Sequence, residues 1–338
     1  MPNVISAIGY SLGKVHTGML VYLCDLHREG LVRPLESLFG ALGISVPRRP
    51  TAFREWNSVD LAIFDGDEDV DGDKDVPRIL VEMKVDDHEH KTTKRVDGHK
   101  ERDFQTIVYP EAFPGCDEYV YITLGVGDHF RAPYGKRFRW IRLRDFAAAL
   151  DKLDASDAIL DNWKEAVRNE ADLHKRVRHD DRSRLADYRP GAWNICFLGH
   201  LKDAFKEGST GKMKDLDLTC YTCGRRPDTI LNFGCSKLPE YLEINNNGRL
   251  NLKVNLEGCA DHTAKRCTIA ETSQWVRSAY PEVSHEVSES GRVGASKTVV
   301  SFDVGLCVSD DVLRFSQGAE HTLRSLREIV DVFQTTPR

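Results

Sequence analysis

The sequence holds 338 residues, 41% of them hydrophobic and 30% charged, with a formal net charge of −6. These values are typical of a soluble globular protein with one large or two medium domains. No apolar run approaches the roughly 20 residues of a membrane-spanning helix. Nine scattered cysteines, an odd number, do not suit a disulfide framework, and the N-terminal stretch lacks an export pattern. We therefore expect a cytoplasmic protein without a membrane partner.

The negative charge is concentrated in one segment. Residues 65–75 (DGDEDVDGDKD) hold seven acidic residues and one lysine, so the rest of the chain is formally neutral. A nucleic-acid partner is therefore not excluded. Three basic clusters either follow a phosphate backbone or form solvated surfaces. They are Lys91, Lys94, Arg95, Lys100 and Arg102; Lys136, Arg137, Arg139, Arg142 and Arg144; and Lys175, Arg176, Arg178, Arg182 and Arg184.

Two helices are predicted before the first strands. Residues 15–29 carry apolar side chains at helical spacing, and Gly30 can end that helix. Residues 33–42 repeat the pattern and stop at Gly43.

A hairpin follows. Residues 59–64 (VDLAIF) and 79–85 (ILVEMKV) read as two apolar strands on either side of the acidic segment. Side chains alternate along a strand, so Glu82 and Lys84 share one face, while Ile79, Val81, Met83 and Val85 fill the other. If Phe64 pairs with Arg78 without a bulge, Asp60 lies opposite Glu82.

Carboxylates that face each other across two strands repel, and burial raises the cost. A divalent metal removes this cost, and oxygen ligands of this kind suit Mg²⁺ or Mn²⁺. A lysine two residues from a metal-binding glutamate can orient a water molecule. The alternative is an ordinary hairpin with charges on its solvated face.

The segment after the hairpin is polar. Residues 86–101 are expected to form a loop, in which His88, His90 and His99 either add polarity or contact a substrate. A helix is predicted over residues 100–109, with Gln105 and Tyr109 on one face. Strands are predicted at 118–124 and 137–143, and a helix at 145–153.

Asp60, Glu82-x-Lys84 and Gln105-x3-Tyr109, in this order, resemble the PD-(D/E)xK nuclease superfamily and the Q-x3-Y element of its RecB-like members. The opening run from His16 to Asp25 and the strand Tyr121–Leu124 resemble a bacterial group of that superfamily. The resemblance covers about the first 145 residues. It implies a restriction-endonuclease-like αβββαβ core with a mixed sheet, although the third core strand is not evident.

The resemblance also implies roles for single residues. Asp60, Glu82 and the Met83 carbonyl would hold Mg²⁺ or Mn²⁺, and Lys84 would orient the attacking water. Gln105 and Tyr109 would support the site. The sequence departs from the superfamily in one position, because Val59 stands where the superfamily has proline. Members of the superfamily often add an upstream glutamate, for which Glu36 is the candidate and Glu55 the rival; the alternative, which we favour for both, is a surface residue.

The rest of the chain suggests a second domain. We expect a nuclease domain over residues 1–153, a helical connector over 154–186, and a C-terminal α+β domain over 187–338. Within the last, the pattern predicts a hairpin over 240–257, a strand over 298–304 and a helix over 321–333. This domain would bind the substrate, a protein partner or second copy, or a signal.

Two further metal motifs are incomplete. Asp67, Asp69, Asp71 and Gly72 match the first half of a calcium loop, but its twelfth position is Arg78. Cys220, Cys223, Cys259 and His262 have spacings that permit a Zn²⁺ site, while free cysteines are often simply buried.

The function that these features predict is metal-dependent hydrolysis of nucleic acid, with DNA favoured over RNA. The resemblance implies 5′-phosphate and 3′-hydroxyl products and suggests bacterial antiviral defence or restriction. The alternatives are a degenerate module of the same fold that binds nucleic acid or protein without cleaving it, and a zinc-dependent interaction protein.

Overall fold

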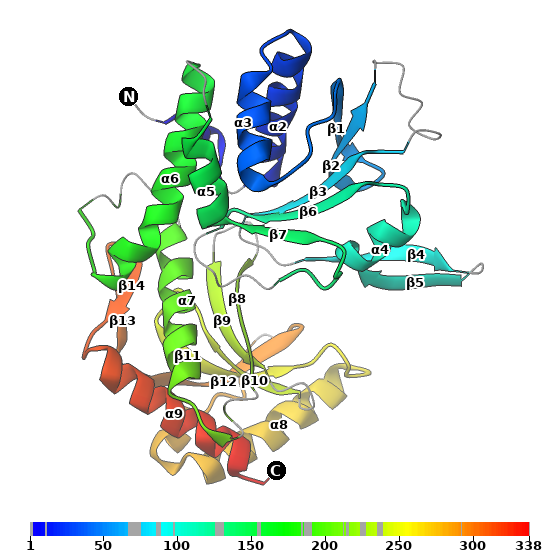
Figure 1. Ribbon diagram of the computed structural model, residues 1–338. Coiled ribbons are helices and arrows are strands. Elements are labelled where there is room, and N and C mark those ends of the chain that lie inside the picture. Colours follow the sequence, from blue (N-terminus) through cyan, green and yellow to red (C-terminus); the bar gives the residue numbers. More distant parts are fainter. Residues whose placement is uncertain are drawn as a thin grey trace. The chain divides into compact units, whose positions relative to one another are not determined.

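The computed structural model describes residues 3–10, 12–66, 76–85, 89–96, 99–125, 132–153, 157–183, 185, 191–211, 213, 216–223, 228–234, 239–291 and 293–337. The chain forms two compact units. The first comprises Met1–Arg176 and Ser183–Arg189, and the second comprises Val177–Arg182 and Pro190–Arg338 (Figure 1). Both combine helices with a five-stranded sheet, so the fold is mixed α/β. Within these described ranges, no helix is long and apolar enough to cross a membrane.

The first unit is built on a mixed sheet with the order β1-β2-β3-β6-β7. The pairs β1–β2 and β2–β3 are antiparallel, whereas β3–β6 and β6–β7 are parallel. The strands are β1 (Pro50–Trp56), β2 (Val59–Asp65), β3 (Ile79–Lys84), β6 (Glu118–Thr123) and β7 (Arg139–Arg142).

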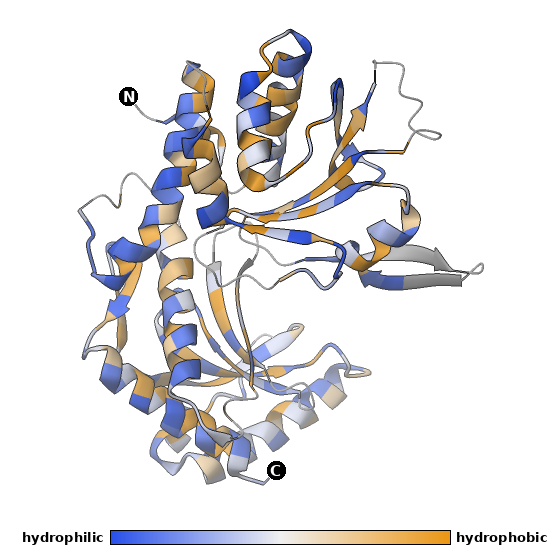
Figure 2. Ribbon diagram, in the orientation of Figure 1, coloured by the Kyte–Doolittle hydropathy of each residue, from blue (hydrophilic) through white to orange (hydrophobic). Residues whose placement is uncertain are grey.

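The two faces of this sheet pack against different helices. The larger core contains Ile63 and Val81 from the sheet, and helical residues such as Leu20, Leu38 and Trp163. Leu80, on the other face, packs with Val108 and Tyr109 of α4. The helices of the larger core are α1 (Val4–Ile8), α2 (Gly13–Arg28), α3 (Arg33–Leu42), α5 (Leu143–Asp151) and α6 (Ala158–Arg178); α4 is Gln105–Ala112. Figure 2 shows the apolar strands β2 and β3 between these layers.

The central hairpin was predicted correctly. Strands β2 and β3 fall within a residue of their expected bounds, and the register pairs Leu61 with Val81 and Ile63 with Ile79. Ile79, Val81, Met83 and Val85 all lie in the larger core, as their alternation predicted. The strong apolar alternation left one register that buries these side chains.

The first strand of the sheet was not recognised from the sequence. Strand β1 lies at an edge, and most of its side chains are partly or fully exposed, so it lacks an apolar alternation. It joins β2 through Asn57 and Ser58, whose φ angles are 46° and 69°. Positive φ at both central residues is the geometry of a tight two-residue hairpin turn.

The expectation for residues 86–109 was wrong in two respects. Part of the expected loop forms an antiparallel hairpin of β4 (Lys91–Val96) and β5 (His99–Phe104). The helix begins at Gln105 rather than near residue 100, and it continues through Pro110 to Ala112. Both strands are polar on both faces, so they show no hydrophobic period, and their pairing depends on backbone hydrogen bonds and on the anchored ends described below.

Helix α6 belongs to the first unit for most of its length. Leu160, Trp163, Ala166 and Val167 lie in the larger core, although residues 154–186 were expected to be a connector. The indole Nε1–H of Trp163 donates to His16 Nδ1 at 3.0 Å, so the helix is also fixed to α2 by a buried hydrogen bond.

The second unit contains an antiparallel sheet with the order β12-β11-β10-β9-β8, and a separate hairpin, β13–β14. The expected hairpin over 240–257, the strand near 298–304 and the final helix are present. The bounds are α7 (Ala192–Glu207), β8 (Asp217–Cys223), β9 (Asp228–Gly234), β10 (Glu240–Ile244), β11 (Arg249–Asn255), α8 (His262–Ala279), a 3₁₀ helix (Pro281–Glu286), β12 (Ser296–Asp303), β13 (Leu306–Ser309), β14 (Val312–Phe315) and α9 (Ala319–Thr335).

Candidate functional site

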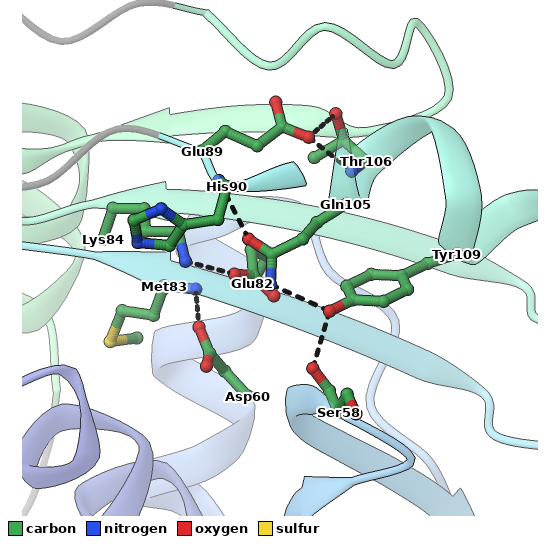
Figure 3. A network of polar contacts seen from close by, with 10 residues as sticks. All are labelled: Ser58, Asp60, Glu82, Met83, Lys84, Glu89, His90, Gln105, Thr106 and Tyr109. Carbon is green, nitrogen blue, oxygen red and sulfur yellow. Dashed lines mark hydrogen bonds and ion pairs between the residues drawn. The ribbon is translucent and has the colours of Figure 1, made fainter. Parts of the chain in front are cut away.

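The candidate site lies where β2 and β3 separate. The paired part of the two strands ends at Leu61 and Val81, and this register places the next residues, Asp60 and Glu82, across from each other, as predicted. Beyond that point a side chain replaces the backbone acceptor: Asp60 Oδ2 accepts the N–H of Met83 at 2.8 Å (Figure 3).

This separation leaves the backbone of Met83 outside the β2–β3 ladder. In a strand, the N–H and C=O of one residue project toward the same neighbour. Because the Met83 N–H points to Asp60, its carbonyl also points to the β2 side, where no ladder continues. The same carbonyl oxygen lies 3.4 Å from the position that a Cβ on Gly13 would occupy, at the first residue of α2. The geometry therefore presents two carboxylates and a carbonyl in one region.

Glu82 and Lys84 project together from the face that packs against α4. The side chain of Glu82 is fully buried and Lys84 is 8% exposed. The Lys84 ammonium donates to Glu82 Oε1 at 2.5 Å. The second oxygen of Glu82, Oε2, is buried and has no hydrogen-bond partner in the described part of the chain. A buried carboxylate with one unsatisfied oxygen is costly, and such groups often mark a site for an ion or water.

Electrostatics at Glu82 agree with this description. Burial, followed by the charge of the neighbouring Asp60 carboxylate, raises the pKa of Glu82 to about 8, and the Lys84 ammonium opposes the increase. A raised carboxyl pKa means that the charged form is poorly stabilised. The lysine alone therefore does not compensate for the two carboxylates.

The residues that could hold a divalent cation are Asp60, Glu82 and the Met83 carbonyl. All three supply oxygen, which suits Mg²⁺ or Mn²⁺. The unsatisfied Glu82 Oε2, and the Met83 carbonyl beyond the paired part of β2 and β3, are the observations that fit such an ion.

Helix α4 brings the predicted pair Gln105 and Tyr109 to this region. The Tyr109 hydroxyl donates to the Ser58 carbonyl at 2.6 Å and accepts from Gln105 Nε2 at 2.9 Å. Gln105 Oε1 in turn accepts the backbone N–H of His90 at 3.2 Å. Burial and then the charge of Glu82 raise the pKa of Tyr109. The pair thus connects α4 to the residue two positions before Asp60.

Glu89 is a residue that sequence analysis missed. It is 8% exposed, and its Oε1 accepts both the backbone N–H and the hydroxyl of Thr106. Its Oε2 accepts the N–H of Tyr134 at 3.0 Å, and the Thr106 hydroxyl accepts the N–H of Gly135 at 2.8 Å. Figure 3 shows Glu89 directed at Thr106 in the first turn of α4. An acidic side chain there satisfies free N–H groups and the helix dipole. A single Glu in a polar segment carries no signal of this in the sequence.

Glu36 and Glu55, the two candidates for the upstream glutamate, are both exposed. Glu36 lies in the first turn of α3. Glu55 lies next to the β1–β2 turn and pairs with Lys14 at the surface, which lowers its pKa. His90 contacts Gln105 through its backbone. The calcium motif at 67–72 and His88 lie outside the described residues.

The zinc motif receives no support from the described side chains. Cys220 is buried in β8 and its thiol donates to the Ile195 carbonyl, whereas the Cys259 thiol contacts the Thr268 hydroxyl. His262 is exposed at the start of α8, and the side chain of Cys223 lies outside the described part. In the ranges that the structure describes, no group of three or more His, Cys, Asp or Glu side chains is arranged for a metal. The zinc site stays a prediction.

Comparison with known proteins adds no relative. No protein-family model matches the chain, and no curated protein or solved structure matches it.

Proposed function

We propose that the chain is a metal-dependent nuclease that hydrolyses phosphodiester bonds, with DNA as the favoured substrate. The observation that carries the proposal is the buried Glu82 carboxylate. One of its oxygens binds the Lys84 ammonium, the other has no partner among the described residues, and Asp60 faces it from the next strand. A divalent cation would compensate for this excess of negative charge.

The order of elements supports the proposal. Helices α2 and α3 are followed by three antiparallel strands, β1, β2 and β3, then by α4 and by β6, which is parallel to β3. This order agrees with the αβββαβ order of the superfamily that the motifs resemble, with β1 as the candidate for the strand that the sequence left open. The β4–β5 hairpin is an insertion between β3 and α4.

The chemistry follows from the positions of the side chains. Asp60, Glu82 and the Met83 carbonyl would hold Mg²⁺ or Mn²⁺, which when bound supplies positive charge to the phosphate under attack. Lys84 would donate to the attacking water and orient it, since its ammonium already lies against Glu82. Tyr109 would keep the start of β2, and with it Asp60, in position through the Ser58 carbonyl.

The first test is cleavage. We expect the wild-type chain to cleave plasmid, linear duplex or single-stranded DNA in Mg²⁺ or Mn²⁺ and to be inactive in EDTA. Lys84→Ala should lower the rate by about 100-fold or more, as for other groups that position a reacting proton. Lys152→Ala, at an exposed lysine after α5, is the matched control.

The products give a second readout. Attack by a metal-positioned water should leave 5′-phosphate and 3′-hydroxyl ends, which a DNA ligase rejoins without prior phosphorylation. If wild type and Lys84→Ala behave alike on every DNA and RNA substrate, the nuclease proposal is wrong. Metal-dependent binding without cleavage would instead indicate the degenerate module of the same fold.

A further inference from the structure

The insertion between β3 and α4 divides its charges between two faces. In the β4–β5 ladder, Lys91 pairs with Phe104, Thr93 with Arg102, and Arg95 with Lys100. Residues directly opposite each other in an antiparallel pair share a face, and so do alternate residues of one strand. The register positions of this face therefore hold Lys91, Arg95, Lys100 and Arg102, and no acidic residue.

The other face has a different composition. Thr92 pairs with Asp103, Lys94 with Glu101, and Val96 with His99. These positions hold one lysine against two acidic residues. The basic residues at 91–102 therefore divide between two faces. We call the face with Lys91, Arg95, Lys100 and Arg102 the cationic face; on the other face, Lys94 is paired with Glu101.

Two residues of the cationic face, Lys91 and Arg102, are exposed at the surface. The Lys91 ammonium lies 5.1 Å from the centre of the Phe104 ring, and that ring stacks on Tyr134 with a centroid separation of 3.6 Å. Tyr134 is itself 44% exposed. Cations beside a partly exposed aromatic pair are typical of surfaces that bind nucleic acid.

The base of the hairpin is fixed beside the candidate site. The N–H of Gln105 donates to the His90 carbonyl at 3.0 Å, and Gln105 Oε1 accepts the His90 N–H. Glu89 binds Thr106 one residue further along α4. The strands therefore start from the same residues that hold Gln105 and Tyr109, and Figure 1 shows the ribbon extending away from α4.

We propose that the cationic face of the β4–β5 hairpin binds the phosphate backbone of nucleic acid next to the candidate site. The choice of partner rests on the proposed function. Alternate positions on a strand are about 7 Å apart. Lys91, Arg102 and the opposed pair Arg95 and Lys100 therefore occupy three successive register positions along the ribbon, a spacing that can follow successive phosphates. A two-stranded ribbon is also narrow enough to enter the major groove of a duplex.

The test is the salt dependence of binding by the full chain in EDTA, where cleavage is absent. Fluorescence anisotropy with a labelled DNA duplex, and with one of its single strands, gives the affinity at several salt concentrations. Each lost phosphate contact lowers the slope of log K against log salt by about 0.9 on duplex DNA. We expect Arg95→Ala to lower the slope by about 0.9 and Arg95→Ala/Lys100→Ala to lower it by about 1.8.

Lys94→Ala is the matched control, because it removes one positive charge from the adjacent residue on the opposite face. Its slope should equal that of the wild type, and thermal melts should show that all variants are folded. Equal effects of Arg95→Ala and Lys94→Ala, no effect of either, or no binding by the wild type would each overturn the hairpin proposal.

The two proposals fail in different ways. If wild type and Lys84→Ala are equally inactive but Arg95→Ala still lowers the slope selectively, the hairpin surface stands and the nuclease does not. If cleavage depends on Lys84 but the slopes of Arg95→Ala and Lys94→Ala are equal, the nuclease stands and the hairpin surface does not.

Discussion

Glu82 is the residue at which stability and the proposed chemistry oppose each other. A fully buried carboxylate beside Asp60 destabilises the folded chain when it is ionised, and the single Lys84 contact offsets only part of that cost. Glutamine has nearly the same shape as glutamate and no charge. A comparison of the wild type with Glu82→Gln therefore separates the electrostatic cost from packing.

Stability of the metal-free chain should depend on pH through this residue. The folded pKa of about 8 lies above the ordinary value of 4.5, so the folded state holds the proton more tightly than the unfolded state. The resulting stability is fully present below about pH 4.5 and is lost as pH rises through about 8. We compare the free energy of unfolding of Glu82→Gln with that of wild type in EDTA. The difference should shift in favour of Glu82→Gln by roughly 1–3 kcal/mol as the pH rises from 5 to 8.5. Urea unfolding at both pH values measures this; a constant difference would contradict it.

A bound cation should make the ionised carboxylates stabilise the folded chain instead of destabilising it. An ion that binds the folded state stabilises it by mass action, so Mn²⁺ should raise the melting temperature of wild type at pH 8. In Asp60→Asn, the amide oxygen can still accept the Met83 N–H, but one ligand charge is lost. We expect that variant to fold and to lose most of the Mn²⁺-induced shift, whereas Asp145→Asn, at an exposed position, should keep it. The readout is the melting temperature with and without Mn²⁺, and an unchanged shift in Asp60→Asn would remove Asp60 from the site.

At the scale of elements, sequence analysis predicted the strands and helices whose apolar residues recur at strand or helical spacing. Strands β2 and β3 were predicted with their register because Leu61, Ile63, Ile79 and Val81 must all reach one core. The opposed Asp60 and Glu82 followed from that register. Strand β1 and the β4–β5 hairpin were missed because neither has an apolar face. Their pairing depends on neighbours that no local pattern reveals.

The start of α4 shows the same limit. Its first turn is fixed by Glu89, 17 residues before Thr106, so no capping pattern stands next to the helix. Removing the carboxylate would leave the Thr106 N–H, the Thr106 hydroxyl and the Tyr134 N–H without their acceptor. Each unsatisfied buried group costs about 1–3 kcal/mol.

We therefore expect Glu89→Ala to lower the free energy of unfolding by roughly 3 kcal/mol. Glu328→Ala is the control: Glu328 is exposed in α9, so removal of its carboxylate should change stability by less than about 0.5 kcal/mol. Urea unfolding monitored by circular dichroism compares the two. Equal effects would show that Glu89 is not an anchor of α4.

At the scale of the molecule, α6 changes where the first unit ends. The charged pattern over 154–186 suggested a connector, because most of its residues are polar. Its few apolar residues nevertheless lie on one side and fill the larger core, with Leu160 and Trp163 fully buried. A helix with a narrow apolar stripe and a long polar face looks like a linker in composition, although its packing makes it part of the first unit.

This placement predicts how the chain can be divided. A fragment of residues 1–153 lacks Trp163, which is buried against Phe146 and donates to His16, and it exposes the core surface that α6 covers. A fragment of residues 1–189 retains Trp163 and the rest of α6, which covers that core surface. We expect the longer fragment to melt cooperatively and the shorter one to melt without cooperativity or to aggregate, because burial of side chains such as Leu160 and Trp163 contributes about 2–5 kcal/mol each. In the longer fragment, Trp163→Phe keeps an aromatic ring but removes the hydrogen bond to His16, and it should cost about 1–2 kcal/mol. Circular dichroism melts of the three proteins measure these differences, and a cooperative transition of the 1–153 fragment at the temperature of 1–189 would show that α6 is dispensable for the first unit.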